Sequence, residues 1–387
     1  MTSTKTVSVV TSSRADYGLL KRLLLRLKSS NSMKLNLIVT GTHLLDEFGN
    51  TVSEIEEDGF DDFHTIKVDM GDDSKAGMAV ATGRAMEAFA KYFKDNRPDI
   101  LVVLGDRFEI YAASSAAFLM GIPIAHISGG DITEGAIDDT VRHCITKMSS
   151  IHFPGCEQSR NRIIRMGENP SVVFNVGEPG VENCLNTALM TKEELSDSIG
   201  FDVTKGNVAV VTYHPVTREN DTALAEVYEL IRAMDKIPLQ YIITLANADS
   251  GGREINAVWE KEQATHDNWL VISSLGMTRY LSAMKYSKAV IGNSSSGIVE
   301  APSMNVPTVN IGTRQEGRMM AKSVISCECK EKDIKAAIEK SLDDEFVKSL
   351  KDYDSPFGDG NTSEQIYKKL EEYLNMEHDS IKCKFYE

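Results

Sequence analysis

Acidic residues follow two of the strands that the sequence predicts, and paired carboxylates could perform acid–base chemistry. Asp106 comes directly after an apolar run that ends near residue 104. The segment after the next predicted strand carries three more candidates, which are Asp131, Glu134 and Asp138. Because neighbouring parallel strands end at the same edge of a sheet, we expect these acids to lie together. Carboxylates beside a reacting carbon are suited to general acid–base catalysis. Two structural alternatives remain open: Asp106 as a helix cap, and a Gly-rich surface loop after residue 128.

Hydroxyl and cationic side chains follow other strand ends and could hold an anion. Ser12, Ser13 and Arg14 follow the first strand, where the alternative is a helix start capped by Ser13. In the second half, His214 follows a strand and could hold or protonate a departing phosphate. The other candidates for nucleotide binding are Asn247, Asp249, Ser294, Ser295, Glu300 and Arg314. Serines at a helix N-terminus can donate to a diphosphate, and a carboxylate such as Glu300 can accept from ribose hydroxyls.

Several common cofactor and metal motifs are missing from the sequence. No G-x-G-x-x-G follows the first predicted strand, and no G-x-x-x-x-G-K-[ST] occurs elsewhere. These absences disfavour a dinucleotide-dependent redox enzyme and a P-loop NTPase. The six cysteines are scattered without C-x-x-C spacing, and there is no H-E-x-x-H. We therefore expect neither a disulfide framework nor a metal site.

The charge balance limits the partners of the chain. Its 387 residues include 42 Lys and Arg against 57 Asp and Glu, which gives a formal net charge of −15. A nonspecific grip on nucleic acid or on an anionic membrane is therefore not expected. Because the sequence also lacks a long uncharged apolar run and a recognisable secretory signal, we expect a cytoplasmic protein.

Short β-rich runs alternate with stretches of helical period, which predicts an α/β fold with parallel strands. The polar segment 187–206 interrupts this rhythm and is the expected linker between two doubly wound units. The expected domains are residues 1–186 and 187–362, with a C-terminal helix from about 363 to 387. The predicted strands are 6–12, 35–41, 64–70, 100–105, 123–128, 150–154, 172–176, 208–213, 240–245, 269–273, 289–292 and 308–311. Each domain must bring the polar segments to the carboxyl edge of its sheet.

Nine segments together resemble the hydrolysing UDP-N-acetylglucosamine 2-epimerases of sialic-acid and related nonulosonate synthesis. In order along the chain they read SRADY, GTHLLDEFGNT, LGDRFE, GGDITEGAIDD followed by RH, HPVT, NADSGG, GNSSSGIVEAPS, GTRQEGR and FGDGNTS. They extend from Arg14 to Thr362. The resemblance implies a glycosyltransferase-B-like architecture of two Rossmann-like domains, with the active site in the interdomain cleft and the C-terminal helix packed back on the first domain.

The resemblance also implies a reaction and a set of residue roles. UDP-GlcNAc and water would give N-acetylmannosamine and UDP, through elimination to 2-acetamidoglucal and then hydration, with no cofactor. Asp106 and Asp138 would be the acid–base carboxylates, and His214 would assist departure of the diphosphate. Relatives are often homo-oligomers, so a dimer or tetramer is expected. The residues implied to surround UDP are Arg14, Arg107, Asn247, Asp249, Ser294, Ser295, Glu300 and Arg314.

One residue departs from the pattern that the resemblance implies. Many relatives carry a glutamate where this sequence has Ser128. Because serine cannot take that proton role, our hypothesis is that Asp131 supplies the missing carboxylate, with Glu134 as the alternative.

Four other functions remain open at this point. They are the same chemistry on a UDP-2,4-diacetamido-2,4,6-trideoxyhexose, a nonhydrolysing UDP-GlcNAc 2-epimerase, a glycosyltransferase of the same architecture, and a noncatalytic UDP-sugar sensor.

Overall fold

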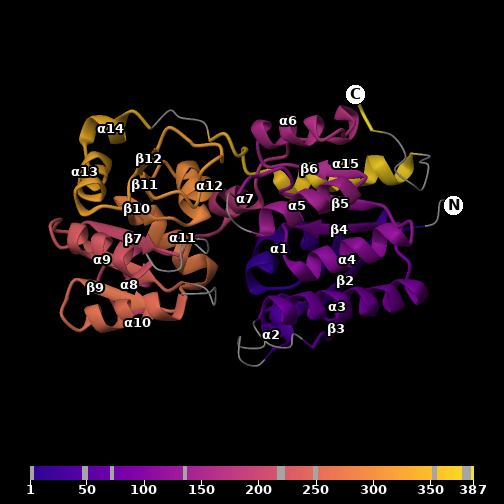
Figure 1. Ribbon diagram of the computed structural model, residues 1–387, viewed down its shortest axis with the longest axis horizontal. Helices are drawn as coiled ribbons and strands as arrows, with labels where there is room; N and C mark the ends of the chain where they lie inside the picture. The colour runs from indigo at the N-terminus through magenta and orange to yellow at the C-terminus, as the bar shows by residue number, and fades with distance from the viewer. Residues whose placement is uncertain are drawn as a thin grey trace. The chain divides into compact units, whose positions relative to one another are not determined.

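The computed structural model describes residues 4–45, 51–69, 74–133, 137–215, 223–246, 252–350, 355–376 and 385–387. The chain divides into two compact units (Figure 1). The first comprises Met1–Asp131, Ile137–Glu182 and Asn361–Glu387, and the second comprises Asn183–Gly360 together with the short segment that begins at Ile132.

A six-stranded parallel sheet forms the centre of the first unit, in the order β3-β2-β1-β4-β5-β6. Its strands are β1 (Lys5–Thr11), β2 (Met33–Thr40), β3 (Phe63–Ile66), β4 (Ile100–Leu104), β5 (Ile124–Ile127) and β6 (Ile151–Phe153). The helices are α1 (Arg14–Lys28), η1 (Gly41–Leu44), α2 (Val52–Glu57), α3 (Lys75–Asp95), α4 (Phe108–Leu119), α5 (Ile137–Met148), α6 (Glu157–Arg165), η3 (Pro170–Val172) and α15 (Thr362–Asn375). The helix α7 (Pro179–Asn186) contains the boundary between the units.

The second unit repeats this topology. Its strand order is β12-β11-β10-β7-β8-β9. Read from β9 to β12, with β7 counted as the first strand, this is the order of the first sheet. The strands are β7 (Val208–Thr212), β8 (Gln240–Thr244), β9 (Trp269–Ile272), β10 (Ala289–Gly292), β11 (Thr308–Ile311) and β12 (Val324–Cys327). The helices are α8 (Lys192–Ile199), α9 (Ala223–Met234), α10 (Gly252–Gln263), α11 (Gly276–Tyr286), α12 (Ser295–Ser303), α13 (Glu331–Ser341) and α14 (Asp344–Lys348). The predicted α/β class with two Rossmann-like units is confirmed.

Both faces of each sheet are covered by helices, so the central strands are apolar on both sides. Val9 packs in a cluster with α1 and α15, whereas the adjacent Val10 packs with α3, α4 and α5. In the second unit Val211 packs with α9, α10 and α13, whereas Val210 packs on the opposite face with α8 and α11. Side chains of a strand alternate between faces, so a doubly covered sheet requires continuous apolar runs. This requirement explains why the strands were visible in the sequence.

Two sequence predictions differ from the structure. The predicted strand 172–176 is absent, because Val173 makes only an isolated bridge with His152 after a short 3-10 turn. Part of the expected linker 187–206 is helical, since Thr191 and Glu194 form a capping box at the start of α8. Leu195 of this helix is buried in the core of the second unit. The segment was predicted as a linker because α8 is largely polar and buries only one face.

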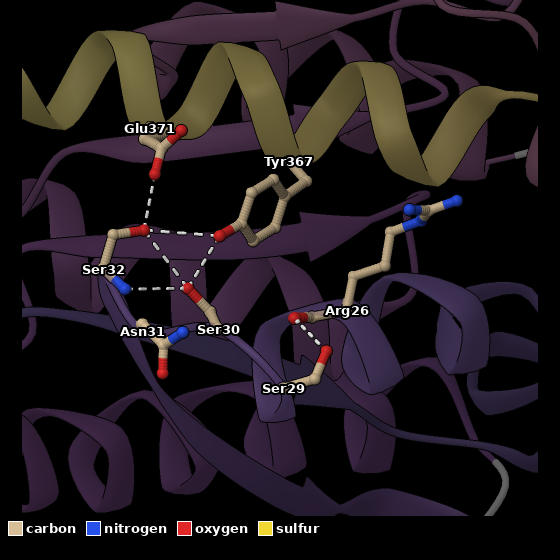
Figure 2. Close-up of a pocket in the computed structure, with 7 residues that line it drawn as sticks. All are labelled: Arg26, Ser29, Ser30, Asn31, Ser32, Tyr367 and Glu371. Atoms are coloured by element: carbon tan, nitrogen blue, oxygen red, sulfur yellow. Dashed lines mark hydrogen bonds between the residues drawn. The ribbon is translucent and has the colours of Figure 1, made fainter.

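The C-terminal helix α15 packs on α1 within the first unit, and polar contacts surround this apolar interface. Ile366 and Leu370 join the core beside α1. Figure 2 shows a polar pocket at the end of α1, where Tyr367 Oη lies 2.7 Å from Ser30 Oγ and Ser32 Oγ donates to Glu371 Oε1 at 2.5 Å. Because residues 29–32 lead into the beginning of β2, this pocket lies at the amino edge of the sheet, opposite the polar segments expected to act chemically.

Candidate functional site

The strand order places a point of reversal in the middle of each sheet. In the first unit it lies between β1 and β4, and in the second between β7 and β10. Open parallel sheets bind ligands beyond the carboxyl ends of the strands at such points, because the flanking loops there run in opposite directions. In each unit, the candidate residues after these strands therefore lie where such sheets bind ligands.

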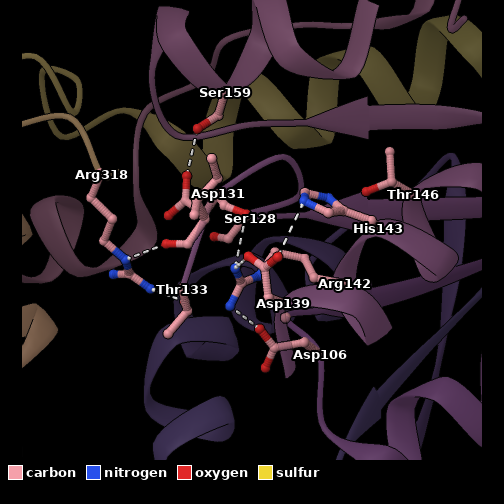
Figure 3. Close-up of polar contacts among 12 residues, drawn as sticks. Asp106, Ser128, Asp131, Thr133, Asp139, Arg142, His143, Thr146, Ser159 and Arg318 are labelled. Carbon is pink, nitrogen blue, oxygen red and sulfur yellow. Dashed lines mark hydrogen bonds and ion pairs between the residues drawn. The ribbon is translucent and has the colours of Figure 1, made fainter. Parts of the chain in front are cut away.

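Arg142 joins the two acidic segments of the first unit (Figure 3). Its guanidinium, on α5, forms an ion pair with Asp106 after β4, and Nη1 donates to the carbonyl of Asp131 at 2.9 Å. The Arg142 side chain is only 7% exposed. Asp106 does not cap α4, whose N-cap is Arg107 without a side-chain hydrogen bond. The capping alternative for Asp106 is therefore wrong, and the structure brings Asp106 and Asp131 to one arginine.

Asp131 is also held by its side chain. Its Oδ1 accepts a hydrogen bond of 2.5 Å from Ser159 Oγ, on α6. The two residues that follow Asp131 belong to the second unit, where Arg318 Nε donates to the carbonyl of Ile132 and Nη2 to Thr133 Oγ1, both at 3.2 Å. The Asp131 carboxylate is thus fixed at the carboxyl edge of the first sheet by a hydroxyl.

Arg107 interacts with a second group of acidic side chains at the same edge of the sheet. Its guanidinium lies 3.1 Å from Glu109 Oε1, and the Glu109 side chain is fully buried. Burial lowers the pKa of Arg107, but the charges of Glu109, Asp16 and Asp138 oppose this and raise it above its ordinary value. Burial also raises the pKa of Asp16, which accepts from Ser12 Oγ at 2.7 Å. Asp138, in the first turn of α5, is therefore close enough to interact electrostatically with Arg107.

His126 supports the loop that carries Asp106. It is fully buried, with Nε2 lying 2.8 Å from the carbonyl of Gly105 and Nδ1 3.2 Å from Thr146 Oγ1. Burial lowers the pKa of His126 to about 3, so the imidazole is neutral at neutral pH. Gly105 has φ of 72°, a conformation that glycine adopts without steric cost. The histidine and the glycine together fix the turn that begins at the end of β4.

In the second unit, Asn293 holds His214 at the point of strand reversal. Asn293 Oδ1 accepts from the His214 amide at 2.7 Å, and its Nδ2 donates to the His214 carbonyl at 2.8 Å. Arg314 Nη1 and Gln315 Nε2 donate to the Asn293 carbonyl at 3.0 and 2.8 Å. Burial, followed by the charge of Arg314, lowers the pKa of His214 to about 3. The structure therefore brings the predicted residues His214 and Arg314 together through Asn293.

The predicted serines and Glu300 lie on α12, which follows Asn293. Ser294 is the N-cap and accepts from the Ser296 amide at 3.4 Å, whereas Ser295 is exposed in the first turn. Ser296 Oγ is hydrogen-bonded to Tyr280 Oη. Burial raises the pKa of Glu300, although a hydrogen bond from Ser296 acts in the opposite direction. A polar group of hydroxyls and one carboxyl thus follows β10 at a helix N-terminus.

Arg14 and three other candidates are not placed with these groups. Arg14 Nε lies 3.0 Å from Glu54 Oε1, and both side chains are exposed to a similar degree. Glu134, Asn247 and Asp249 lie outside the described residues. The described parts of the chain hold no group of three His, Cys, Asp or Glu side chains suited to a metal ion. Among the helices that the structure describes, none combines the length and apolar character needed to cross a membrane.

Arg142 and Asn293 were not predicted as site residues. The signal for Arg142 was its position four residues after Asp138 on one helix, which puts both on one face. The signal for Asn293 was its position between a buried strand and a serine-rich helix start. Each residue binds a segment distant in sequence, Arg142 through the Asp106 carboxylate and Asn293 through the His214 backbone, a role that residue type alone does not reveal.

Together these features define an α/β protein with an acidic group in one sheet unit and a hydroxyl-rich helix N-terminus in the other, which suits a nucleotide-linked ligand. Residues 25–371 match the family described as UDP-N-acetylglucosamine 2-epimerase, and the chain belongs to this family. The resemblance seen in the sequence is confirmed at this level.

Named relatives agree with this assignment. The chain is 37% identical to the UDP-N,N'-diacetylbacillosamine 2-epimerase (hydrolyzing) of Legionella pneumophila, over 93% of this chain and 94% of the relative. It is 36% identical to the GDP/UDP-N,N'-diacetylbacillosamine 2-epimerase (hydrolyzing) of Campylobacter jejuni, over 89% of each chain. The fold is similar to that of the UDP-GlcNAc 2-epimerase of Neisseria meningitidis, solved with UDP-GlcNAc, with a TM-score of 0.80 at 19% identity over 94% of this chain and 99% of that one.

Proposed function

We propose that this chain is a hydrolysing 2-epimerase of a UDP-linked 2-acetamido sugar. The observation that carries the proposal is the meeting of Asp106 and the Asp131 segment at Arg142, in a member of the UDP-N-acetylglucosamine 2-epimerase family. An elimination and a hydration at neighbouring sugar carbons both need a proton acceptor and a proton donor, and carboxylates held at one sheet edge are suited to these roles.

The proposed reaction has two steps. A carboxylate removes the C2 proton while the bond between C1 and the UDP oxygen breaks, which leaves a C1–C2 double bond and free UDP. Water then adds at C1 and C2 receives a proton from the opposite face. We assign the acid–base roles to Asp106 and Asp138, with Asp131 as the further carboxylate. The pair with Arg142 keeps Asp106 in a fixed position for its step.

We assign nucleotide binding to the second unit. Ser294, Ser295 and the amides at the start of α12 are suited to the diphosphate, and Glu300 to the ribose hydroxyls. His214 is neutral at neutral pH, so it would act by donating a hydrogen bond to the departing diphosphate rather than as a cationic acid. Donors that are fixed before the reaction stabilise developing charge most effectively.

The sugar is the finer part of the proposal. The names of the Legionella and Campylobacter relatives favour UDP-N,N'-diacetylbacillosamine, which is a 2,4-diacetamido-2,4,6-trideoxy sugar nucleotide. UDP-GlcNAc is the second candidate, since the family takes its description from it and the Neisseria protein was solved with it. We therefore propose the diacetamido sugar first and UDP-GlcNAc as the alternative.

Turnover of the two nucleotides by the purified chain, without added metal or nicotinamide, tests this proposal. Release of UDP with a free 2-epimerised sugar would support hydrolysing epimerisation, and the ratio of kcat/KM for the two nucleotides would identify the sugar. A UDP-linked epimer without free UDP would instead indicate the nonhydrolysing reaction. Tight binding of both nucleotides with no turnover would indicate a sensor, and transfer of the sugar to an acceptor would indicate a glycosyltransferase.

A further inference from the structure

Ser128 and Glu178 form a hydroxyl–carboxylate pair at the carboxyl edge of the first sheet. Ser128 is the first residue after β5, and its Oγ donates to Glu178 Oε2 at 2.7 Å. Glu178 is 50 positions later in the sequence and directly precedes α7. Figure 3 shows Ser128 among Asp131, Asp139 and Arg142. The pair therefore adds a carboxylate to the acidic group, at a position that the proposed roles do not use.

The backbone at Ser128 is held in an unusual conformation. Its φ is 57°, and Asn305 is the only other non-glycine residue with positive φ in the described parts of the chain. For an L-residue this left-handed conformation costs about 1–2 kcal/mol. The amide of Ser128 donates to the carbonyl of Phe153 at 2.9 Å, which fixes the turn. Such conformations persist where the surrounding structure determines them, and they are frequent at functional sites.

The Glu178 carboxylate has space only because residue 155 is a glycine. A Cβ atom at Gly155 would lie 1.8 Å from Glu178 Oε1, so the carboxylate lies directly against the Gly155 backbone. Gly155 comes soon after β6, the neighbour of β5 in the sheet. One carboxylate oxygen thus lies against the Gly155 backbone while the other accepts from Ser128.

We propose that Ser128 and Glu178 relay a proton from the water that adds to the sugar, an inference that rests on the proposed hydrolysing reaction. As the water oxygen bonds to C1, its proton passes to Ser128 Oγ and the Ser128 proton passes to Glu178 Oε2. The electrons of the C1–C2 double bond take a proton at C2 from an acid of the site. Ser128 ends as a hydroxyl and Glu178 as a carboxylic acid, which then returns its proton to solvent.

The chemistry of the pair assigns it to this step rather than to the elimination. A serine hydroxyl that donates to a carboxylate retains lone pairs that can accept from water. Transfer of a proton between oxygens through such a hydroxyl is facile, whereas removal of the C2 proton requires a base of matched strength in direct contact with that carbon's hydrogen. The relay therefore serves hydration, and the directly placed carboxylates serve C2.

Glu178→Gln tests the relay when UDP, free sugar and the 2-acetamidoglycal intermediate are followed together by proton NMR. We expect formation of free sugar to fall by about 10²-fold or more, the usual loss for a missing general base. UDP release should fall less, so that the unsaturated intermediate accumulates. Ser128→Ala should behave in the same way, and the double variant should be no slower than either single one, because the two residues act as a unit.

Moving the carboxylate provides the decisive comparison. In Ser128→Glu combined with Glu178→Ala, the truncation at position 178 vacates the volume that Glu178 now occupies, so that a glutamate at position 128 can extend into it, and we expect formation of free sugar to recover at least tenfold over Glu178→Ala. Glu157→Gln is the matched control, because Glu157 is exposed and pairs with Arg160 at 2.9 Å, and it should keep the wild-type rate.

Three results would overturn the relay: a wild-type rate for Glu178→Gln, an equal loss of UDP release and free sugar without the intermediate, or no recovery in the relocated variant. If the unmodified protein itself releases no UDP from either nucleotide, the proposed function fails instead.

Discussion

Asp106 is the carboxylate on which the proposed chemistry depends most directly. It lies at the reversal point of the first sheet and its charge is paired with the buried Arg142. His126, on β5, holds the same loop through the carbonyl of Gly105. Asp106 is thus held by an arginine on one helix, and its loop by a histidine within the sheet.

Asp106→Asn is expected to lower turnover by about 10²- to 10⁴-fold, because the amide can neither accept nor deliver the proton. The change removes the charge that Arg142 faces but keeps the shape of the side chain. Measurement of kcat on whichever nucleotide is turned over, with circular dichroism as the check on folding, tests this prediction. Asp95→Asn, at an exposed helix end, is the control that should retain full activity.

Asp131→Asn tests the hypothesis that this residue supplies the carboxylate expected at position 128. The amide can still accept from Ser159, whose hydroxyl donates to Oδ1, so the local fold should persist. We expect kcat to fall by at least about tenfold with little change in KM, as for a group that acts in the transition state. Near-normal turnover in a folded Asp131→Asn protein would contradict the hypothesis and direct attention to Glu134.

His214 should influence the rate without influencing its pH dependence. Burial lowers the pKa of His214 from the ordinary 6.5 to about 3, so the folded state favours the neutral ring. Protonation of the ring therefore destabilises the folded state as the pH falls from about 6.5 toward 3. Between pH 6.5 and 9 the ring does not titrate in the folded protein. We expect His214→Asn to lower kcat while the shape of the kcat–pH profile over this range stays unchanged. Loss of an inflection near pH 6.5 to 7 in the variant would show that the histidine titrates there.

The end of β10 shows how an element positions the residues proposed to bind the nucleotide. Gly292 has φ of 131°, and a Cβ there would lie 1.9 Å from the carbonyl oxygen of Thr212 on β7. The glycine therefore permits the close approach of β7 and β10 that lets Asn293 bind both the amide and the carbonyl of His214.

Gly292→Ala is expected to destabilise the protein by about 1–3 kcal/mol or more, the range for a strained backbone position, because backbone atoms rather than a flexible side chain must move. The free energy of urea unfolding measures this. Gly83→Ala is the matched control: no atom lies within 4 Å of its Cβ, and it lies inside α3, where alanine is favoured by about 0.5–1 kcal/mol. Equal stability of the two variants would contradict the packing argument.

The sequence predicted an element correctly where burial of that element imposes a recognisable pattern of apolar residues. Strands such as Val208–Thr212 were found because burial on both faces requires an uninterrupted apolar run. The segment 172–176 has a similar composition but forms a single isolated bridge, at Val173, instead of a strand, and composition does not report pairing. The helix α8 was hidden because only one of its faces is buried, through residues such as Leu195.

Most of the predicted residues of the candidate site follow a strand closely, whereas Asp138 and Glu300 lie on the helices that come next. Asp106, Asp131, His214 and Ser294 were found in this way. Glu178 was missed because it reaches Ser128 from a segment 50 residues away, and the contact depends on the absence of a side chain at Gly155. Such contacts arise from tertiary structure, so a single sequence carries no local sign of them.

The whole chain uses one topology twice and assigns different chemistry to each copy. The strand orders of the two sheets are equivalent, yet the first reversal point carries acids and arginines and the second carries hydroxyls, an amide and a neutral histidine. This division is what the proposed reaction requires, since a sugar carbon must exchange protons while a diphosphate is bound and released. The architecture is shared by both units, and the proposed difference in function rests on the side chains that follow four strands.

Exchange of the proton at C2 of a UDP-linked 2-acetamido sugar, together with release of UDP, is the step on which the proposed function depends. Incubation of the purified chain in heavy water with UDP-N,N'-diacetylbacillosamine, and separately with UDP-GlcNAc, tests it when the products are followed by proton NMR. We expect one of the two nucleotides to give free UDP and a free 2-epimerised sugar that carries deuterium at C2. Release of UDP with a sugar that retains its original C2 proton and configuration would contradict it.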